Sequence, residues 1–367
     1  MSVERSFTRI VESLPPTIPF VAPEALERQR RRALQLRIGA NESNFGLSPM
    51  ARAAMVQAVD KIHWYNDPEG FELRQALAAE LDVDMSAVAL GAGIDELLGL
   101  MVRLFVEPGE TVVTSLGAYP TFNYHVEGYG GVLHKAPYRE DREDLDALLA
   151  LAQKVQPKLV YVANPDNPMG TWQNADALRN FIEALPSASI LLLDEAYVDF
   201  APEEALLPLA PDGARVVRLR TFSKVHGMAG ARIGYAVADK EIIAALDKIR
   251  NHFGVNRVAQ AGALASLADR AFVLSVVKQV EEGKRAYAAL ARELGIEMIP
   301  SATNFVALDI GNGERARALL QALLARDVFV RMPGVAPLDR CIRLTVGPAA
   351  ERKVFAEILR EVLPQVG

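Results

Sequence analysis

Short apolar runs alternate with amphipathic stretches from about residue 87 to residue 250, and no other feature constrains the fold as strongly. Residues 159–163 and residues 189–193 are too short for helices, and polar residues follow each run. Residues 88–90 form a third run, which precedes leucines at helical spacing. Strands that alternate with helices pack as a mostly parallel sheet with helices on both faces. The chain is therefore predicted to have an α/β fold.

The pattern changes near residue 255. Two long helical stretches, 255–267 and 270–294, are expected before strands at 304–308, 328–331 and 341–346. With 367 residues, 50% of them hydrophobic, the chain is long enough to form two domains. We therefore expect a second, smaller α+β domain in this part of the chain.

A lysine with hydroxyls and an arginine around it is the first candidate for chemistry. Lys224 lies just after the strand-like residues 215–221, with Thr221 and Ser223 before it and Arg232 eight positions after it. An amine beside an anion site suits a Schiff base to pyridoxal phosphate, whose phosphate the hydroxyls and the guanidinium would bind. The alternative is a solvated lysine in a surface loop.

Polar side chains also follow the two apolar runs upstream. Asp194 and Tyr197 come after residues 189–193. In open α/β sheets, ligands bind outside the carboxyl ends of the strands. Asp194 is therefore a candidate partner for a protonated ring nitrogen, and Tyr197 for a ring hydroxyl. Residues 164–170, Asn-Pro-Asp-Asn-Pro-Met-Gly, follow the other run and predict a rigid loop.

Together these segments resemble the fold type I pyridoxal-phosphate aminotransferases of class I/II, and within them the histidinol-phosphate aminotransferase branch. The family's Asn-Pro-x-Asn-Pro-x-Gly loop matches residues 164–170, and its Asp-x-Ala-Tyr motif matches residues 194–197. Its Schiff-base motif matches Thr221, Ser223, Lys224 and Arg232. Residues 38–46 and 64–68 are imperfect copies of two further family segments.

The resemblance implies a division of the chain into two domains. A large cofactor-binding domain would span residues 51–255 and contain a mostly parallel, seven-stranded sheet between helices. A small α+β domain would be discontinuous and consist of residues 1–50 and 256–367.

The resemblance also implies roles around the cofactor. Lys224, Asp194 and Tyr197 would be catalytic, with Lys224 as tether and general base in a ping-pong amino transfer. Asn167 would bind the ring oxygen. The remaining cofactor contacts would be Ala92, Gly93 and Ile94 at the phosphate, Tyr119 stacked on the ring, and Tyr65 from the second subunit of a homodimer. A dinucleotide site at residues 91–96 is disfavoured, because Glu96 replaces the third glycine of that fingerprint.

The match to the family is less complete at the expected substrate site. By resemblance, Arg343 would pair with the carboxylate of donors such as glutamate, and Arg331 would bind the phosphate of histidinol phosphate. Asn41 lies in the N-terminal segment that is similar to a family loop. The resemblance implies that it belongs to the substrate site. Phe20 stands where the family has a tyrosine, and residues 332–337 replace a glycine- and aromatic-rich loop. Both departures weaken the prediction of a phosphorylated substrate.

The resemblance implies a histidinol-phosphate:2-oxoglutarate aminotransferase, an enzyme of histidine biosynthesis that takes an amino donor and a 2-oxo acid. An aromatic or other amino-acid aminotransferase is the alternative. Less favoured alternatives are a decarboxylase of a phosphorylated amino acid, an acyl-condensing enzyme and a cofactor-binding regulator. A regulator would need a DNA-binding module, for which the chain has no spare length.

Composition narrows the class further. A net charge of −6 offers no broad attraction to nucleic acid. The sequence shows no apolar stretch of membrane-spanning length and no signal-peptide core, so membrane insertion and export are not expected. A single cysteine, Cys341, fits a reducing cytoplasm. The five histidines are scattered, and no metal site is predicted.

Overall fold

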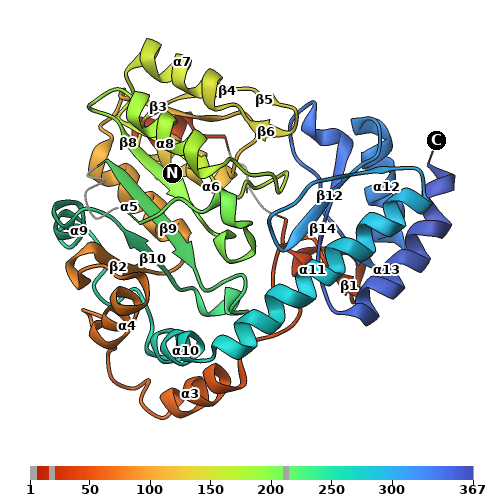
Figure 1. The fold of residues 1–367 in the computed structure, drawn as a ribbon, viewed down its shortest axis with the longest axis horizontal. Coiled ribbons are helices and arrows are strands. Elements are labelled where there is room, and N and C mark those ends of the chain that lie inside the picture. The colour runs from red at the N-terminus through yellow and green to blue at the C-terminus, as the bar shows by residue number, and fades with distance from the viewer. Residues whose placement is uncertain (1–5, 16–20, 210–214, 367) are drawn as a thin grey trace, which may run out of the picture.

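A seven-stranded sheet forms the centre of the larger part of the molecule (Figure 1). The computed structural model describes residues 6–15, 21–209 and 215–366. The strand order is β2–β10–β9–β8–β7–β3–β4, and β10 runs antiparallel to both of its neighbours while the other pairs are parallel. The strands are β2 (Val88–Gly91), β3 (Thr111–Ser115), β4 (Val132–Ala136), β7 (Leu159–Ala163), β8 (Ile190–Asp194), β9 (Val216–Thr221) and β10 (Gly234–Val237). The prediction of a mostly parallel, seven-stranded sheet is confirmed.

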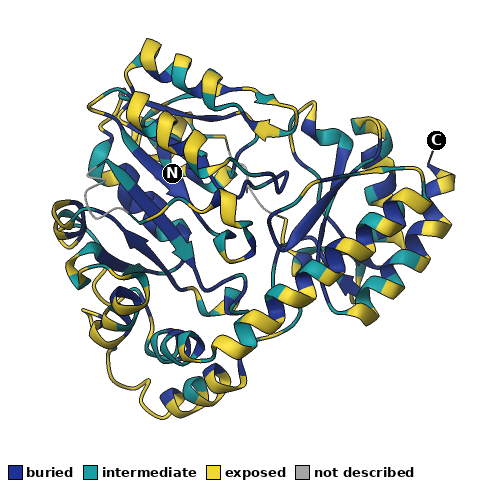
Figure 2. Ribbon diagram, viewed as in Figure 1, coloured by how far each residue is buried: buried dark blue, intermediate teal, exposed yellow. Residues whose placement is uncertain are grey.

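Helices cover both faces of this sheet because its central strands are apolar on both sides. In β7, Tyr161 and Ala163 face one layer of helices, whereas Val160 and Val162 face the other. The first layer contains α5 (Ile94–Phe105), α6 (Pro120–Gly128) and α9 (Lys240–Leu246), and the second contains α7 (Leu145–Val155) and α8 (Ala175–Ala184). Figure 2 shows the strands buried and the outer faces of the helices exposed. Each fully buried aliphatic side chain in these layers contributes roughly 1.5–3 kcal/mol.

A second, smaller core lies beside the sheet and uses both ends of the chain. Its three-stranded antiparallel sheet has the order β11 (Glu297–Ile299), β12 (Phe305–Asp309), β14 (Cys341–Thr345). The helices α11 (Arg270–Glu293), α12 (Gly313–Ala325) and α13 (Ala349–Val362) pack around it. A short parallel pair, β1 (Leu36–Arg37) with β13 (Val328–Phe329), attaches the N-terminal segment to this core.

One predicted strand is shorter than expected. The strand predicted over residues 328–331 ends at Phe329, and Arg331 forms only an isolated bridge to Arg343 on β14. The backbone N–H of Arg343 donates to the carbonyl of Arg331 at 2.6 Å. This bridge places two arginines on adjacent backbones.

The remaining elements lie mainly along the edge of the larger part. They are α1 (Arg9–Ser13), α2 (Pro23–Arg30), α3 (Pro49–Val59), α4 (Phe71–Leu81), α10 (Arg257–Ala268) and a hairpin of β5 (Tyr138–Arg139) and β6 (Arg142–Glu143). Helix α10 packs against α3 and α4, and α11 continues from it into the smaller core (Figure 1). Among the described residues, no single helix is long and apolar enough to cross a membrane; α10 and α11 meet that test only as a pair with an 80° bend between them.

Candidate active site

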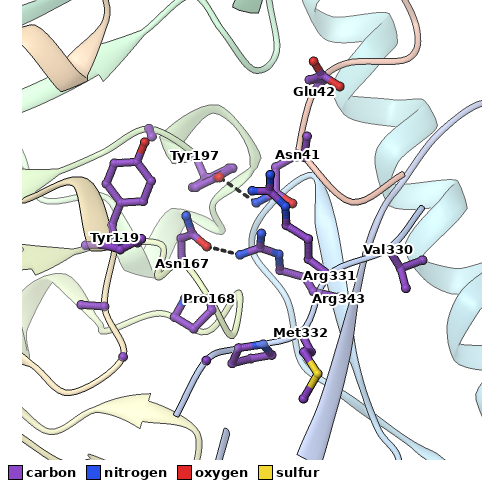
Figure 3. A pocket seen from close by; sticks show the side chains of 18 of the residues that line it. Asn41, Glu42, Tyr119, Asn167, Pro168, Tyr197, Val330, Arg331, Met332 and Arg343 are labelled. Carbon is purple, nitrogen blue, oxygen red and sulfur yellow. Dashed lines mark hydrogen bonds between the residues drawn. The ribbon is translucent and has the colours of Figure 1, made fainter. Parts of the chain in front are cut away.

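The predicted site residues gather around a cavity of about 970 Å³ at the carboxyl ends of β7, β8 and β9. This volume lies at the upper end of the ~300–1,000 Å³ that small-molecule sites occupy. The walls come from segments far apart in the chain, including the N-terminal residues 40–42, the start of α5 and the bridge between Arg331 and Arg343 (Figure 3). The location is the one expected for a ligand of an open α/β sheet.

Lys224 reaches the cavity from the turn that follows β9. Its Nζ donates to the backbone carbonyl of Asn41 at 3.0 Å and lies 5.3 Å from the centre of the Tyr197 ring. The chain can turn this tightly because Gly227 has a φ of 69°, and a Cβ there would meet the Gly46 carbonyl at 1.9 Å. The lysine is thus held by a neutral oxygen and an aromatic face.

Asp194 is the last residue of β8 and lines the cavity. One carboxylate oxygen, Oδ1, accepts the backbone N–H of Ala196 at 2.9 Å, and the other, Oδ2, accepts the Tyr161 hydroxyl at 2.7 Å. Burial raises the pKa of Asp194 to about 6, although both hydrogen bonds and the nearby Lys224 ammonium favour the charged form. The carboxylate can therefore oppose a ligand cation near neutral pH.

Asn41 and Tyr197 form a wall beside the lysine. Asn41 has a left-handed backbone, with a φ of 57°, and its Nδ2 donates to the Tyr197 hydroxyl at 3.0 Å (Figure 3). The Asn41 N–H donates to Oγ1 of Thr345 at 3.0 Å, which fixes the segment against β14. Tyr197 packs edge-on against Phe305, with ring centres 5.3 Å apart.

The start of α5 and the turn after β9 together form a candidate anion cradle. Gly93 caps α5 with a φ of 83°, and a Cβ on it would lie 2.4 Å from Nη2 of Arg232. Thr221 and Ser223 line the same side of the cavity and are joined through their hydroxyls at 2.9 Å. A helix N-terminus with hydroxyls and a guanidinium beside it suits a phosphate. Neither Ala92 nor Gly93 lines the cavity, and the N–H of Ala92 donates to Glu96.

Two arginines lie on the opposite wall (Figure 3). Nη1 of Arg343 donates to Oδ1 of Asn167, and burial lowers the pKa of Arg343 to about 10, so it stays cationic at neutral pH. Arg331 donates from Nη2 to the Val21 carbonyl at 3.2 Å, and burial lowers its pKa as well. Two neighbouring guanidinium groups can bind two anionic groups of one ligand, or one at a time.

The loop of residues 164–170 presents Asn167 to the cavity. Asn164 fixes the loop through both of its amide atoms, which bond the backbone of Gln173. The carboxylate of Asp166 accepts the Met169 N–H at 2.9 Å and the Tyr138 hydroxyl at 2.8 Å. The rigid loop that the sequence predicts is therefore built from its own polar side chains.

Three residues of the cavity wall keep a buried polar atom without a hydrogen-bond partner among the described residues. They are Asn41, through Oδ1, Asn123, through Oδ1, and Arg343, through Nε. An unsatisfied buried group costs about 1–3 kcal/mol, which a bound ligand or a water molecule can offset. These atoms, the cradle and Asp194 fit a ligand with a phosphate, an aromatic nitrogen ring and a further polar group.

The structure brings most of the predicted residues together but not all of them. The residues that line the one cavity are Asn41, Ile94, Tyr119, Asn167, Asp194, Tyr197, Thr221, Ser223, Lys224, Arg232, Arg331 and Arg343. Tyr65 does not line it: its ring is 80% exposed and packs on Phe253 with ring centres 4.7 Å apart. Phe20 lies outside the described residues.

The sequence interpretation missed two residues that act on the predicted ones. Tyr161 donates to Asp194 from inside β7, where the apolar run hides it. Asp95, the second residue of α5, accepts the Tyr119 hydroxyl at 2.8 Å and lies 3.4 Å from Nη2 of Arg232. An acid in the first turn of a helix that starts at a glycine was the available signal for Asp95. The described residues contain no group of three or more histidine, cysteine or acidic side chains that could hold a metal ion.

The profile of the class I and II aminotransferases matches residues 34–359. The chain belongs to this family. Its similarity to individual members extends over almost its whole length.

A histidinol-phosphate aminotransferase of Anaeromyxobacter sp. is 37% identical over 357 residues, which cover 96% of this chain and 98% of the relative. The histidinol-phosphate aminotransferase 2 of Carboxydothermus hydrogenoformans is 34% identical and covers 97% of this chain and 98% of its own length. The crystal structure of the Sinorhizobium meliloti histidinol-phosphate aminotransferase in complex with pyridoxal-5'-phosphate is 48% identical, with a TM-score of 0.96 over 100% of both chains. Thermus thermophilus aspartate aminotransferase, at 22% identity and a TM-score of 0.80, shares the fold.

Proposed function

We propose that this protein is a pyridoxal-phosphate-dependent aminotransferase that exchanges an amino group between histidinol phosphate and 2-oxoglutarate. The observation that carries the proposal is the cavity in which Lys224, Asp194 and the anion cradle lie opposite Arg331 and Arg343. The named relatives support the same proposal, since several at 34–37% identity and a structure at 48% identity are histidinol-phosphate aminotransferases.

When bound, pyridoxal phosphate supplies an aldehyde that condenses with amines and a protonated ring that stabilises negative charge at the substrate carbon. Gly93, Ile94, Thr221, Ser223 and Arg232 would hold its phosphate at the start of α5. Asp194 would face the ring nitrogen, with Asn167 and Tyr197 at the ring hydroxyl and Tyr119 on the ring face.

Lys224 is the residue to which we assign tethering and proton transfer. Its Nζ lies 3.0 Å from a backbone carbonyl and 5.3 Å from the centre of the Tyr197 ring, and it forms no direct ion pair with a carboxylate of the described residues. A released amine at this position can accept a proton from the substrate carbon and return it to another carbon within reach, as a general base and then a general acid.

The two arginines would bind the substrates in turn. Arg343 has a planar guanidinium that suits the α-carboxylate of glutamate and 2-oxoglutarate, and it already lies against Asn167. Arg331 lies farther along the same wall and would bind the phosphate of histidinol phosphate, a donor that has no carboxylate. One site can then accept both substrates of a ping-pong reaction.

Single half-reactions test the proposal. Purified enzyme loaded with pyridoxal phosphate is mixed with histidinol phosphate, glutamate or phenylalanine, and the change in cofactor absorbance is followed in each case. We expect rapid conversion by histidinol phosphate and glutamate and slow conversion by phenylalanine. Rapid conversion by phenylalanine, with histidinol phosphate inert, would make the protein an aromatic aminotransferase instead.

We also propose that the protein acts as a homodimer. Apolar side chains are exposed along α3 and the segment after it, including Val56, Ile62 and Trp64, which are 61–64% exposed. Tyr65 and Phe253 extend this surface at 80% and 47% exposure. An exposed apolar band of this kind suits burial against a second copy, and Tyr65 would then enter the partner's cavity.

The finer context is proposed on the same basis. We place the enzyme in the cytoplasm and its reaction in histidine biosynthesis. We also propose that the chain has a large cofactor-binding domain and a small discontinuous domain. The resemblance places the second domain boundary between residues 255 and 256. Because α10 packs against α3 and α4, we propose to move this boundary to the bend between α10 and α11.

A further inference from the structure

The hydroxyl of Tyr161 donates its one hydrogen to the Asp194 carboxylate at the cavity. It donates to Oδ2 of Asp194 at 2.7 Å, and the side chain is fully buried at 0% exposure. Its ring stacks on Phe122 with ring centres 4.6 Å apart and planes 17° apart. Tyr161 does not line the cavity, so its hydroxyl acts on a ligand through Asp194, which does.

The surroundings of Asp194 make this one donor important. The titratable groups that face the carboxylate are Tyr161 on β7, Lys224 after β9, Asp95 on α5 and Glu143 on β6. Burial and the two acids oppose the charged form, whereas the lysine favours it. Lys224 is the group that moves during the proposed reaction, so its charge is not a constant support. The Tyr161 hydroxyl and the Ala196 N–H are the fixed donors.

We propose that Tyr161 is a positioning residue, whose hydroxyl orients the Asp194 carboxylate and keeps it ionised for a protonated ring nitrogen of the cofactor. The proposal rests on the proposed cofactor and on its orientation over Asp194. A buried, stacked ring cannot turn away, so the hydroxyl stays on Oδ2 while the ligand changes.

The test uses the variant Tyr161→Phe, which keeps the ring and its stack and removes the hydroxyl alone. The affinity of the cofactor-free, full-length protein is measured for pyridoxal phosphate and for its analogue with a C–H in place of the ring nitrogen. We expect the variant to bind pyridoxal phosphate about 10- to 100-fold more weakly, the range for one hydrogen bond to a charged group. Its affinity for the analogue, which has no ring cation to pair with Asp194, should stay within about two-fold.

Tyr138→Phe is the matched control. It also removes a tyrosine hydroxyl from a buried aspartate, because Tyr138 donates to Asp166 at 2.8 Å, but Asp166 does not line the cavity. This variant should leave the ratio of the two affinities unchanged. In an Asp194→Asn background, Tyr161→Phe should add less than about two-fold, since the charge that it supports is gone.

The outcomes separate this inference from the proposed function. Equal loss for both ligands, or no loss for either, would overturn the positioning role of Tyr161. Wild-type protein that binds neither ligand would overturn the proposed cofactor site and this inference with it. Wild-type protein that binds both ligands equally would overturn the pairing of Asp194 with the ring nitrogen, and with it this inference, but not the cofactor site. A melting temperature of the cofactor-free variant within a few degrees of wild type shows that the comparison is made on folded protein.

Discussion

At the scale of single residues, Lys224 is the most direct test of the chemistry. Lys224→Ala should fold normally, because the side chain lies in a cavity and leaves only one backbone carbonyl without its amine. Loss of a positioned general base costs about 10²- to 10⁴-fold in rate, and loss of the tether adds to this. Single-turnover rates with histidinol phosphate measure the effect.

The control for this variant is Lys135→Ala. Lys135 also lines the cavity but is exposed at the end of β4, and we give it no role. It should keep turnover within about two-fold. Comparable turnover in both variants would contradict the assignment of Lys224.

Asp194 gives a prediction about pH. Burial raises its pKa from 3.8 to about 6, so the folded protein binds the proton more tightly than the unfolded chain. The associated stability is present below about pH 4 and is lost as the pH rises through about 6, by ~3 kcal/mol at most. In the cofactor-free state, Asp194→Asn avoids this loss and should gain about 1–3 kcal/mol relative to wild type between pH 4 and pH 8.

Thermal unfolding at the two pH values measures that gain. The exposed Asp176, with 86% of its side chain accessible, supplies the control variant Asp176→Asn, which should show no such change. A gap between Asp194→Asn and wild type that is the same at pH 4 and pH 8 would refute the argument. Asp194→Asn should also weaken cofactor binding, because it removes the negative charge proposed to pair with the ring nitrogen. The wild-type protein keeps this charge although it lowers the stability of the cofactor-free fold.

At the scale of elements, the start of α5 is the part most sensitive to one added atom. Gly93→Ala meets two costs: a left-handed φ of 83° and a Cβ 2.4 Å from the Arg232 guanidinium. The first costs about 1 kcal/mol of stability. The contact between the added Cβ and Arg232 would move the guanidinium out of the anion cradle, so pyridoxal phosphate should bind at least about ten-fold more weakly.

Gly109→Ala separates these two costs. Gly109 has a similar φ of 91°, but nothing lies within 4 Å of a Cβ built on it. It should lose a comparable amount of stability and keep its cofactor affinity. Equal cofactor affinity in the two variants would show that the cradle does not depend on Gly93.

The elements also show what a sequence can and cannot predict here. The apolar run 159–163 matches the strand β7 residue for residue, because an uninterrupted apolar segment of this length is typical of a strand that is buried on both faces. Residues 328–331 were expected as one strand, but pairing with β1 stops at Phe329 and Arg331 joins β14 instead. Periodicity cannot show that exchange of partners, which decides where Arg331 lies.

The candidate site was predicted unevenly for a related reason. Lys224 and Asp194 stand at strand ends, where local pattern is enough to mark them. Tyr161 looks like one more apolar strand residue, and its partner Asp194 is 33 positions away on the next strand. Asn41 meets Lys224 across 183 positions, because the N-terminal segment is attached to the smaller core through β1. Contacts of this kind depend on the tertiary structure.

At the scale of the whole molecule, a single chain leaves the proposed site incomplete. The resemblance implies that Tyr65 would bind the cofactor, yet it is 80% exposed and stands outside its own cavity. The apolar surface around it, with Ile62, Trp64 and Phe253, stays 47–63% exposed in the single chain. A symmetric dimer would bury this surface and exchange the two Tyr65 side chains.

Complementation between two inactive variants tests that exchange. Tyr65→Ala lacks the side chain that would enter the partner subunit's site, and Lys224→Ala lacks the side chain that acts in its own subunit's site. Each homodimer should therefore be severely impaired. In a mixed dimer, the site that keeps Lys224 receives Tyr65 from the other subunit and is intact. Random reassociation makes half of the dimers mixed, each with one of two sites restored, so about a quarter of wild-type activity should return. If Tyr65 served its own subunit, the mixed dimer would contain no intact site and mixing would restore nothing.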